Sequence, residues 1–155
     1  MRPRRRSASS GSGPPARLAE LTALNALGIL LRGTGRADRA LGIHRRSERI
    51  CRDGLPGTSP ELLAVYHANA LHQLGADLVA LDRWADAEPL LRQALAVFED
   101  ANMPAWSEPA RLDLGIALHR LGRQAQATAV LTLAHHGLTA LNHPRRTESA
   151  AYLSP

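Results

Sequence analysis

The side chains best able to carry chemistry are seven histidines, one cysteine and fourteen acidic residues. A metal site on a helix needs ligands three or four residues apart, because only these share a face. His67 and His72 are five residues apart, and His135 and His136 are adjacent, so neither pair meets the requirement. His119 has no histidine at that spacing either. We therefore expect no metal site.

Enzyme chemistry is not indicated either. The sequence has no Gly-rich phosphate loop and no paired cysteines, and its acids are scattered about one per turn, as on solvated helix faces. We expect no catalytic residues and no cofactor. The single cysteine, Cys51, cannot form an internal disulfide, which favours a reducing, cytoplasmic location. No apolar run approaches the ~20 residues of a membrane span, so no membrane partner is expected.

The net charge of +5 lies entirely at the start of the chain. Arg2, Arg4, Arg5, Arg6 and Arg17 stand there without an acid, whereas residues 18–155 hold 14 arginines and 14 acids. Residues 1–15 are rich in Ser, Gly and Pro, and we expect a disordered basic tail followed by one folded domain over 16–155. The tail is either a solvated linker or an arm that binds nucleic-acid phosphates. Because the body is electrically balanced, nucleic acid is not expected to bind elsewhere.

Apolar residues recur at steps of three and four along the rest of the chain, which predicts helices. Gly and Pro break the pattern, and Ser59-Pro60-Glu61 and Ser107-Glu108-Pro109 resemble helix starts. The predicted helices cover about 16–32, 36–52, 59–81, 83–100, 107–121 and 123–141, with a short seventh over 145–153. Pro89 lies past the first turn of its helix, so we expect a slight bend or a late start there.

Two apolar features carry specific expectations. On the first helix one face should be buried, and it holds Leu18, Leu21, Leu24, Leu27 and Leu31; alternatively, Leu30 and Leu31 mark a second buried side. Trp106, close to Pro104, is expected to anchor a loop over a helix end.

A fixed frame recurs three times: Leu-Gly, then Ala twelve residues after the Gly, then a small residue seven further on. The three copies are Gly28, Ala40, Ser47; Gly75, Ala87, Ala94; and Gly115, Ala127, Ala134. Helices that cross at about 8–10 Å need small residues at the crossing. We therefore expect the Gly and Ala of each copy to mark a close approach within a helix hairpin. One hairpin cannot bury its own apolar faces, so three should stack.

The first copy is the most polar. His44 and Ser47 stand where the other copies have Leu and Ala. Terminal units of repeat arrays often differ because their outer face meets water, and this is the expected reason here.

The frame resembles the tetratricopeptide repeat. Trp84 stands where that family often has Tyr, and the run at 88–91 (EPLL) resembles the kinesin-light-chain-like branch, as found in bacterial regulators. The Gly-to-Gly intervals of 47 and 40 residues exceed the usual 34 and suit that branch. The Trp expected early in the first helix of each repeat is absent. The resemblance implies an all-α, right-handed α-solenoid of three antiparallel hairpins (about 18–54, 59–101 and 107–141) with a short C-terminal capping helix.

The resemblance also implies a function: a protein or peptide partner bound in the concave groove formed by the first helix of each hairpin. The positions carried over are Asn25, Ile29, Arg32, Asn69, His72, Gln73, Ala76, Leu112, Asp113, Ile116 and His119. Asn side chains there can donate to and accept from a peptide backbone. Among the positions carried over from the first two hairpins only Arg32 is cationic, so the basic clamp of some members is not reproduced.

Two further expectations stay open. The chain is either a free-standing interaction module or the sensor portion of a larger bacterial transcription regulator or signalling ATPase. The exposed faces of the terminal repeats are candidates for pairing two copies as a homodimer.

Overall fold

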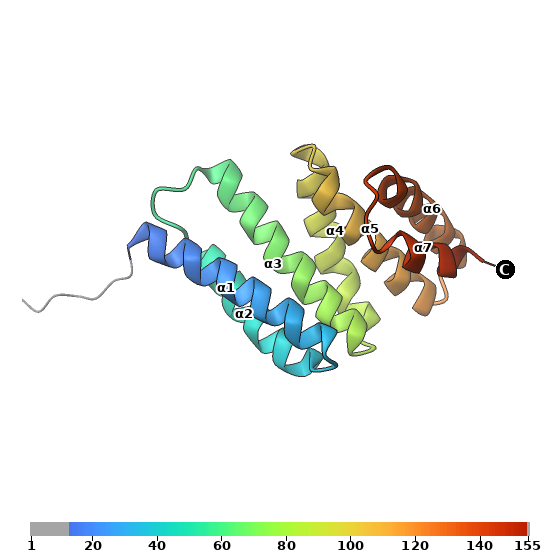
Figure 1. Ribbon diagram of the computed structural model, residues 1–155, viewed down its shortest axis with the longest axis horizontal. Helices are drawn as coiled ribbons and strands as arrows, with labels where there is room; N and C mark the ends of the chain where they lie inside the picture. The colour runs from blue at the N-terminus through green and yellow to red at the C-terminus, as the bar shows by residue number, and fades with distance from the viewer. Residues whose placement is uncertain (1–12, 155) are drawn as a thin grey trace, which may run out of the picture.

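The computed structural model describes residues 13–154, and all regular structure in this part of the chain is helical (Figure 1). The helices are α1 (Pro14–Gly33), α2 (Ala37–Asp53), α3 (Pro60–Ala80), α4 (Trp84–Asp100), α5 (Pro104–Arg120), α6 (Gln124–Ala140) and α7 (Arg146–Leu153). The all-α prediction is confirmed. The predicted basic tail falls mainly on residues 1–12, outside the described residues. None of the described helices is long and apolar enough to cross a membrane.

The helices form three hairpins that stack side by side into a solenoid (Figure 1). α1 pairs with α2, α3 with α4 and α5 with α6, while α2 packs on α3 and α4 on α5. α7 packs against α6 at the C-terminal end, as the predicted capping helix should. The second helix of one hairpin thus covers the first helix of the next.

Each hairpin turns through three residues, and one of them is left-handed in every turn. Gly35 has φ of 77° and Gly122 has φ of 75°, a conformation that costs Gly little. Asp82 occupies the same place in the second hairpin, at φ of 58°. Asp and Asn adopt the left-handed backbone conformation more readily than other non-Gly residues, so the same tight turn forms here without Gly.

The start of α3 agrees with the sequence, but the start of α5 does not. The Ser59 hydroxyl accepts a hydrogen bond from the Leu62 amide at 3.3 Å, as an N-cap should. α5 begins at Pro104, three residues before the predicted start at Ser107. Pro at the first helical position loses no hydrogen bond and has a suitable φ. Pro109 is therefore internal to the helix.

Extending α5 to Pro104 also moves Trp106 from the predicted loop into the first helical turn. Its ring lies 5.7 Å from the ring of Phe98 on α4, which is fully buried. This packing explains the earlier start, since it holds the turn against α4. Pro89 is likewise internal to α4, which begins at Trp84, so the late start considered for that helix does not occur.

The recurring glycines are sites of close packing, and the side chain nearest to each comes from one turn beyond the repeat Ala. A Cβ added at Gly75 would lie 2.6 Å from Leu91, and one at Gly115 would lie 2.7 Å from Leu131. In both cases the neighbour stands sixteen residues after the Gly, not twelve. The repeat Ala residues are nevertheless fully or almost fully buried.

The first hairpin departs from two sequence predictions. On α1, Leu21 and Leu24 are buried, but Leu27 is 44% exposed and Leu30 is 64% exposed. No described helix precedes α1 to cover them. The polar residues of the first copy do not meet water: His44 is 0% and Ser47 is 2% exposed.

Candidate binding groove

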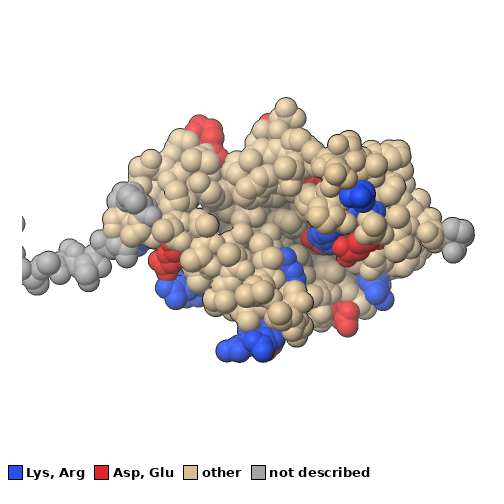
Figure 2. Space-filling view, viewed as in Figure 1, with Lys and Arg blue, Asp and Glu red and all other residues tan. Residues whose placement is uncertain are grey.

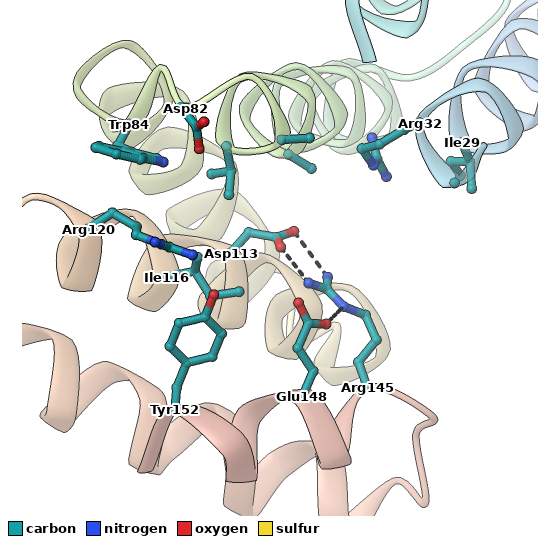
Figure 3. A pocket seen from close by; sticks show the side chains of 14 residues that line it. Ile29, Arg32, Asp82, Trp84, Asp113, Ile116, Arg120, Arg145, Glu148 and Tyr152 are labelled. Atoms are coloured by element: carbon teal, nitrogen blue, oxygen red, sulfur yellow. Dashed lines mark hydrogen bonds and ion pairs between the residues drawn. The ribbon is translucent and has the colours of Figure 1, made fainter. Parts of the chain in front are cut away.

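A cavity of about 490 Å³ opens on the concave side of the solenoid, between the first helices of the hairpins and α7. Figure 2 shows charged side chains gathered on the α7 side of this hollow, and Figure 3 shows its lining from close by. We call it the groove. Its apolar and aromatic lining is Ile29, Ala76, Val79, Ala80, Trp84, Ile116 and Tyr152, and its charged lining is Arg32, Asp82, Asp113, Arg120, Arg145 and Glu148.

One aromatic wall of the groove begins at the turn between α3 and α4. Trp84, the first residue of α4, is half-buried, and the Arg120 guanidinium lies 6.0 Å from its ring centroid. This geometry suits a cation–π contact. Arg120 is exposed, and within residues 13–154 it forms no salt bridge. It is therefore a cation that a ligand can reach, held on an aromatic surface (Figure 3).

The opposite wall comes from α7. Tyr152 points from α7 into the groove (Figure 3), and its ring lies edge-to-face with His119 of α5 at 5.4 Å. The contact fixes α7 against α5, so the last short helix both caps the solenoid and supplies part of the groove surface.

A buried carboxylate, Asp77 of α3, links the first two hairpins beneath the groove. Arg32 of α1 donates to its Oδ1 at 2.7 Å, and His44 of α2 donates through Nδ1 to its Oδ2 at 2.6 Å. Arg32 also donates to the Gln73 side chain at 2.7 Å. Most of the donor capacity of Arg32 is thus used inside the protein.

A second buried carboxylate, Asp113 of α5, joins the second hairpin to the C-terminal cap. Arg145 donates to it at 2.6 and 3.2 Å, and His72 of α3 lies 2.8 Å away. Burial alone would raise the pKa of Asp113, but the Arg145 charge and the hydrogen bonds from both partners outweigh it, so its pKa lies well below the usual range. Conversely, the charges of Asp113 and Glu148 raise the pKa of Arg145 despite its burial. Arg145 is therefore an anchor for α7.

A smaller pocket of about 140 Å³ continues the concave surface toward the N-terminal end. It is lined by Leu21, Thr22, Asn25, Ser47, Tyr66, Asn69, Ala70 and Trp106. The Asn69 side chain donates to the Asn25 side-chain oxygen at 3.3 Å. The buried Ser47 hydroxyl has no hydrogen-bond partner among the described residues. This pocket offers amide and hydroxyl groups and no charge.

The structure distributes the predicted groove positions among three environments. Ile29, Arg32, Ala76, Asp113 and Ile116 line the groove, and Asn25 and Asn69 line the smaller pocket. His72 and Gln73 are buried and bonded to Asp113 and Arg32, and His119 packs on Tyr152. Leu112 is 0% exposed and belongs to the core, so its placement in the groove was wrong.

Nine of the fourteen lining residues were not among the sequence predictions, and those with charged or aromatic side chains are Asp82, Trp84, Arg120, Arg145, Glu148 and Tyr152. Three of them belong to α7 or the turn before it, which the repeat frame does not cover. Arg120 follows the predicted His119 by one residue. Trp84 was interpreted only as part of the repeat pattern, not as a binding residue. Within residues 13–154, no three His, Cys, Asp or Glu side chains meet in an arrangement that could hold a metal ion.

The comparisons with known proteins agree with the stacked hairpins. Sequence models of the tetratricopeptide repeat match residues 21–55 and 66–135. A comparison with curated proteins finds no match. A TPR-like protein from Chlorobium tepidum superposes with a TM-score of 0.75 at 18% identity, over 90% of this chain and 96% of that one.

Two other solved structures share the fold. The apo form of RapI superposes with a TM-score of 0.69 at 14% identity, over 88% of this chain. This chain spans only 36% of the length of RapI. Kinesin-light-chain repeats from Podospora anserina superpose with a TM-score of 0.69 at 18% identity, over 92% of this chain and 66% of theirs. With repeat matches in the first hairpin and across the next two, the chain belongs to the tetratricopeptide-repeat family.

Proposed function

We propose that this chain is a non-catalytic interaction module that holds a peptide or short helix of a partner protein in the groove. The observation that carries the proposal is which arginines of the groove are already paired with a carboxylate of the protein. Arg32 and Arg145 are bound to buried carboxylates, whereas Arg120 has no ion-pair partner within residues 13–154. An exposed cation on an aromatic surface binds a carboxylate next to an apolar group.

The preferred ligand therefore carries an acidic residue, or a terminal carboxylate, beside a large apolar residue. The carboxylate would meet Arg120 and the apolar side chain would pack between Trp84 and Tyr152. The Asn25 and Asn69 amides of the smaller pocket would then bind the backbone of the same peptide further along, because an amide both donates and accepts.

The test begins with selection of random peptides displayed on phage against the purified chain. Selected peptides should share an acidic residue next to an apolar one, and a synthetic copy should bind in a calorimetric titration. Arg120→Glu should weaken binding by about tenfold or more. Arg39→Glu, on the exposed surface of α2, is the matched control and should leave binding unchanged. Equal affinity of the Arg120→Glu variant and the wild type would show that the groove is not the binding site.

The second candidate is that the chain works as the sensor portion of a larger regulator. The fact that favours it is coverage: a unit of this size makes up only 36% of RapI. The test is the neighbouring reading frame in the genome and the size of the protein in a blot of native extract. A DNA-binding or nucleotide-binding domain in the same polypeptide would support this candidate, and a native protein of this length alone would exclude it.

A further inference from the structure

The outer side of α1 carries an uncharged face that nothing covers in the described part of the chain. It consists of Ala23, Ala26, Leu27 and Leu30, all of them exposed. These residues lie at spacings of three and four, so they form one stripe along the helix. We call them the α1 face. It does not overlap the groove, which α1 reaches through Ile29 and Arg32 (Figure 3).

The repeat frame allows the stripe on α1 to be compared with the equivalent positions of the other two hairpins. Leu27 directly precedes the repeat Gly, as do Leu74 on α3 and Leu114 on α5. Leu74 is 7% and Leu114 is 2% exposed, whereas Leu27 is 44% exposed. The positions equivalent to Ala23 behave in the same way, since Ala70 and Ala110 are buried.

The difference has a structural cause. α2 covers α3, and α4 covers α5, but no described helix occupies the corresponding place beside α1. The α1 face therefore has the shape and chemistry of a surface that buries against a helix. Burying exposed apolar area of this kind is favourable.

The first twelve residues of the sequence offer few apolar side chains. Residues 1–12 contain no Leu, Ile, Val or aromatic residue, so they have no large branched or aromatic side chains to place against the stripe. The residues of the α1 face themselves indicate an occupant.

The stripe is complementary to itself. When two copies of α1 run antiparallel about a two-fold axis between Ala26 and Leu27, the large residues of one copy fall on the small residues of the other. Leu30 meets Ala23 of the second copy, and Leu27 meets Ala26 of the second copy. Small residues under large ones allow the close helix approach that packing requires.

Electrostatics do not oppose this arrangement. The nearest charged residues along α1 are Glu20 and Arg32, at either end of the stripe. Glu20 is already paired with Arg46 and Arg32 with Asp77. We infer that two copies of this chain associate as a two-fold dimer through the α1 face.

The interface is isologous and closed, so association stops at the dimer. A contact made mainly by one helix pair lies at the small end of specific interfaces, below about 1,200 Å² of total buried area. The dimer should accordingly form and dissociate reversibly in the micromolar range. The groove of each copy stays open on the concave side.

Sedimentation velocity of the full chain, from about 10 μM to about 1 mM, tests the inference. The wild type should shift from monomer to dimer as concentration rises, with no larger species. Leu30→Glu places two like charges in the interface and should weaken dimerisation by about tenfold or more. Leu133→Glu changes a Leu of similar exposure on α6, 59% against 64% for Leu30, and should leave the dimer intact. Circular dichroism of both variants checks that each one folds.

Site-specific oxidation locates the interface. Ala26→Cys places a thiol beside the proposed two-fold axis and should form an intermolecular disulfide under mild oxidation, while Leu133→Cys should not. The natural Cys51 is buried and does not interfere. The inference is overturned if the wild type stays monomeric at every concentration, which would leave the face to a different protein. It is also overturned if Leu30→Glu dimerises as strongly as the wild type.

Discussion

His44 Nδ1 lies 2.6 Å from Asp77 Oδ2, and neither side chain is exposed to solvent. The pair joins α2 of the first hairpin to α3 of the second. Elsewhere in the chain, the position of His44 is held by Leu91 and Leu131, which pack over a repeat glycine. His44 does the same over Gly28. At this position the first junction between repeats thus contains a buried hydrogen-bonded pair, where the next junction has an apolar Leu.

Removing one member of this pair should destabilise the protein. Asp77→Ala leaves His44 and the Arg32 guanidinium without their shared acceptor, and breaking a buried charged pair costs about 3–5 kcal/mol. Because Arg32 is partly exposed, we expect the lower end, about 3 kcal/mol. Urea denaturation followed by circular dichroism measures the change in the free energy of unfolding.

A double variant separates the pair from its surroundings. The place of Asp77 on α3 corresponds to Ala117 on α5, so His44→Leu with Asp77→Ala copies the apolar residues Leu91 and Ala117 of the second junction. We expect the double variant to recover at least half of the stability lost in Asp77→Ala, since the buried imidazole is no longer left unpaired and Arg32 keeps its bond to Gln73. If the stability lost in the double variant equals the sum of the losses in His44→Leu and Asp77→Ala, the two residues are not coupled.

The second buried carboxylate predicts a particular pH dependence. The pKa of Asp113 is lower in the folded protein than in the unfolded chain. Its stabilising contribution is therefore complete above the unfolded pKa, about 3.9, and is lost as pH falls from there through the folded pKa. Between about pH 4 and pH 2.5, Asp113 alone should lower the free energy of unfolding by at most about 1.4 kcal/mol for each unit by which the pH falls.

Asp113→Asn measures that contribution, because Asn keeps the shape and removes the titration. At pH 7 the variant should be less stable by about 2–4 kcal/mol, since Arg145 loses its main partner. The gap should narrow as the pH falls below about 4. A gap that stays constant from pH 7 to pH 2.5 would contradict a lowered pKa.

The sequence allowed the hairpins to be predicted because their signals are local. The Leu-Gly frame, the apolar steps and the Ser59 cap all act within one helix or one turn. The start of α5 was missed because two local signals compete there. Pro104 and Ser107 both suit a helix start, and the packing of Trp106 on Phe98, which lies in another helix, decides between them.

The groove was predicted only in part because its chemistry depends on distant partners. Asp77 and Asp113 could not be separated from surface acids by spacing, as their partners lie 33 and 32 residues away, at His44 and Arg145. The burial of Gln73 has the same origin, its bond to Arg32. The exposure of Leu27 could not be predicted because its local sequence pattern matches that of the buried Leu74. The difference lies in the helix that covers α3, which has no described counterpart beside α1.

The buried cysteine should be chemically silent in the folded protein. Cys51 is 2% exposed, and burial together with the nearby Glu48 charge raises its pKa to about 11. At pH 8 only about one thiol in a thousand is then ionised, and the thiolate is the reactive form. Alkylation by iodoacetamide, followed by mass spectrometry, should be at least about a hundredfold slower than in 6 M guanidinium chloride. Equal rates in the two conditions would contradict this burial.

A methyl group added at Gly75 should lower the stability of the protein. A Cβ there would lie 2.6 Å from Leu91, whose side chain is fully buried. Overpacking of this kind costs about 1–3 kcal/mol, and the better helix propensity of Ala returns up to about 1 kcal/mol. We expect Gly75→Ala to lower the free energy of unfolding by about 1–2 kcal/mol. Gly33→Ala is the control, because nothing lies within 4 Å of its Cβ position, and it should be neutral or slightly stabilising. Equal stability of the two variants would show that the hairpin is not packed as tightly at Leu91 as the structure indicates.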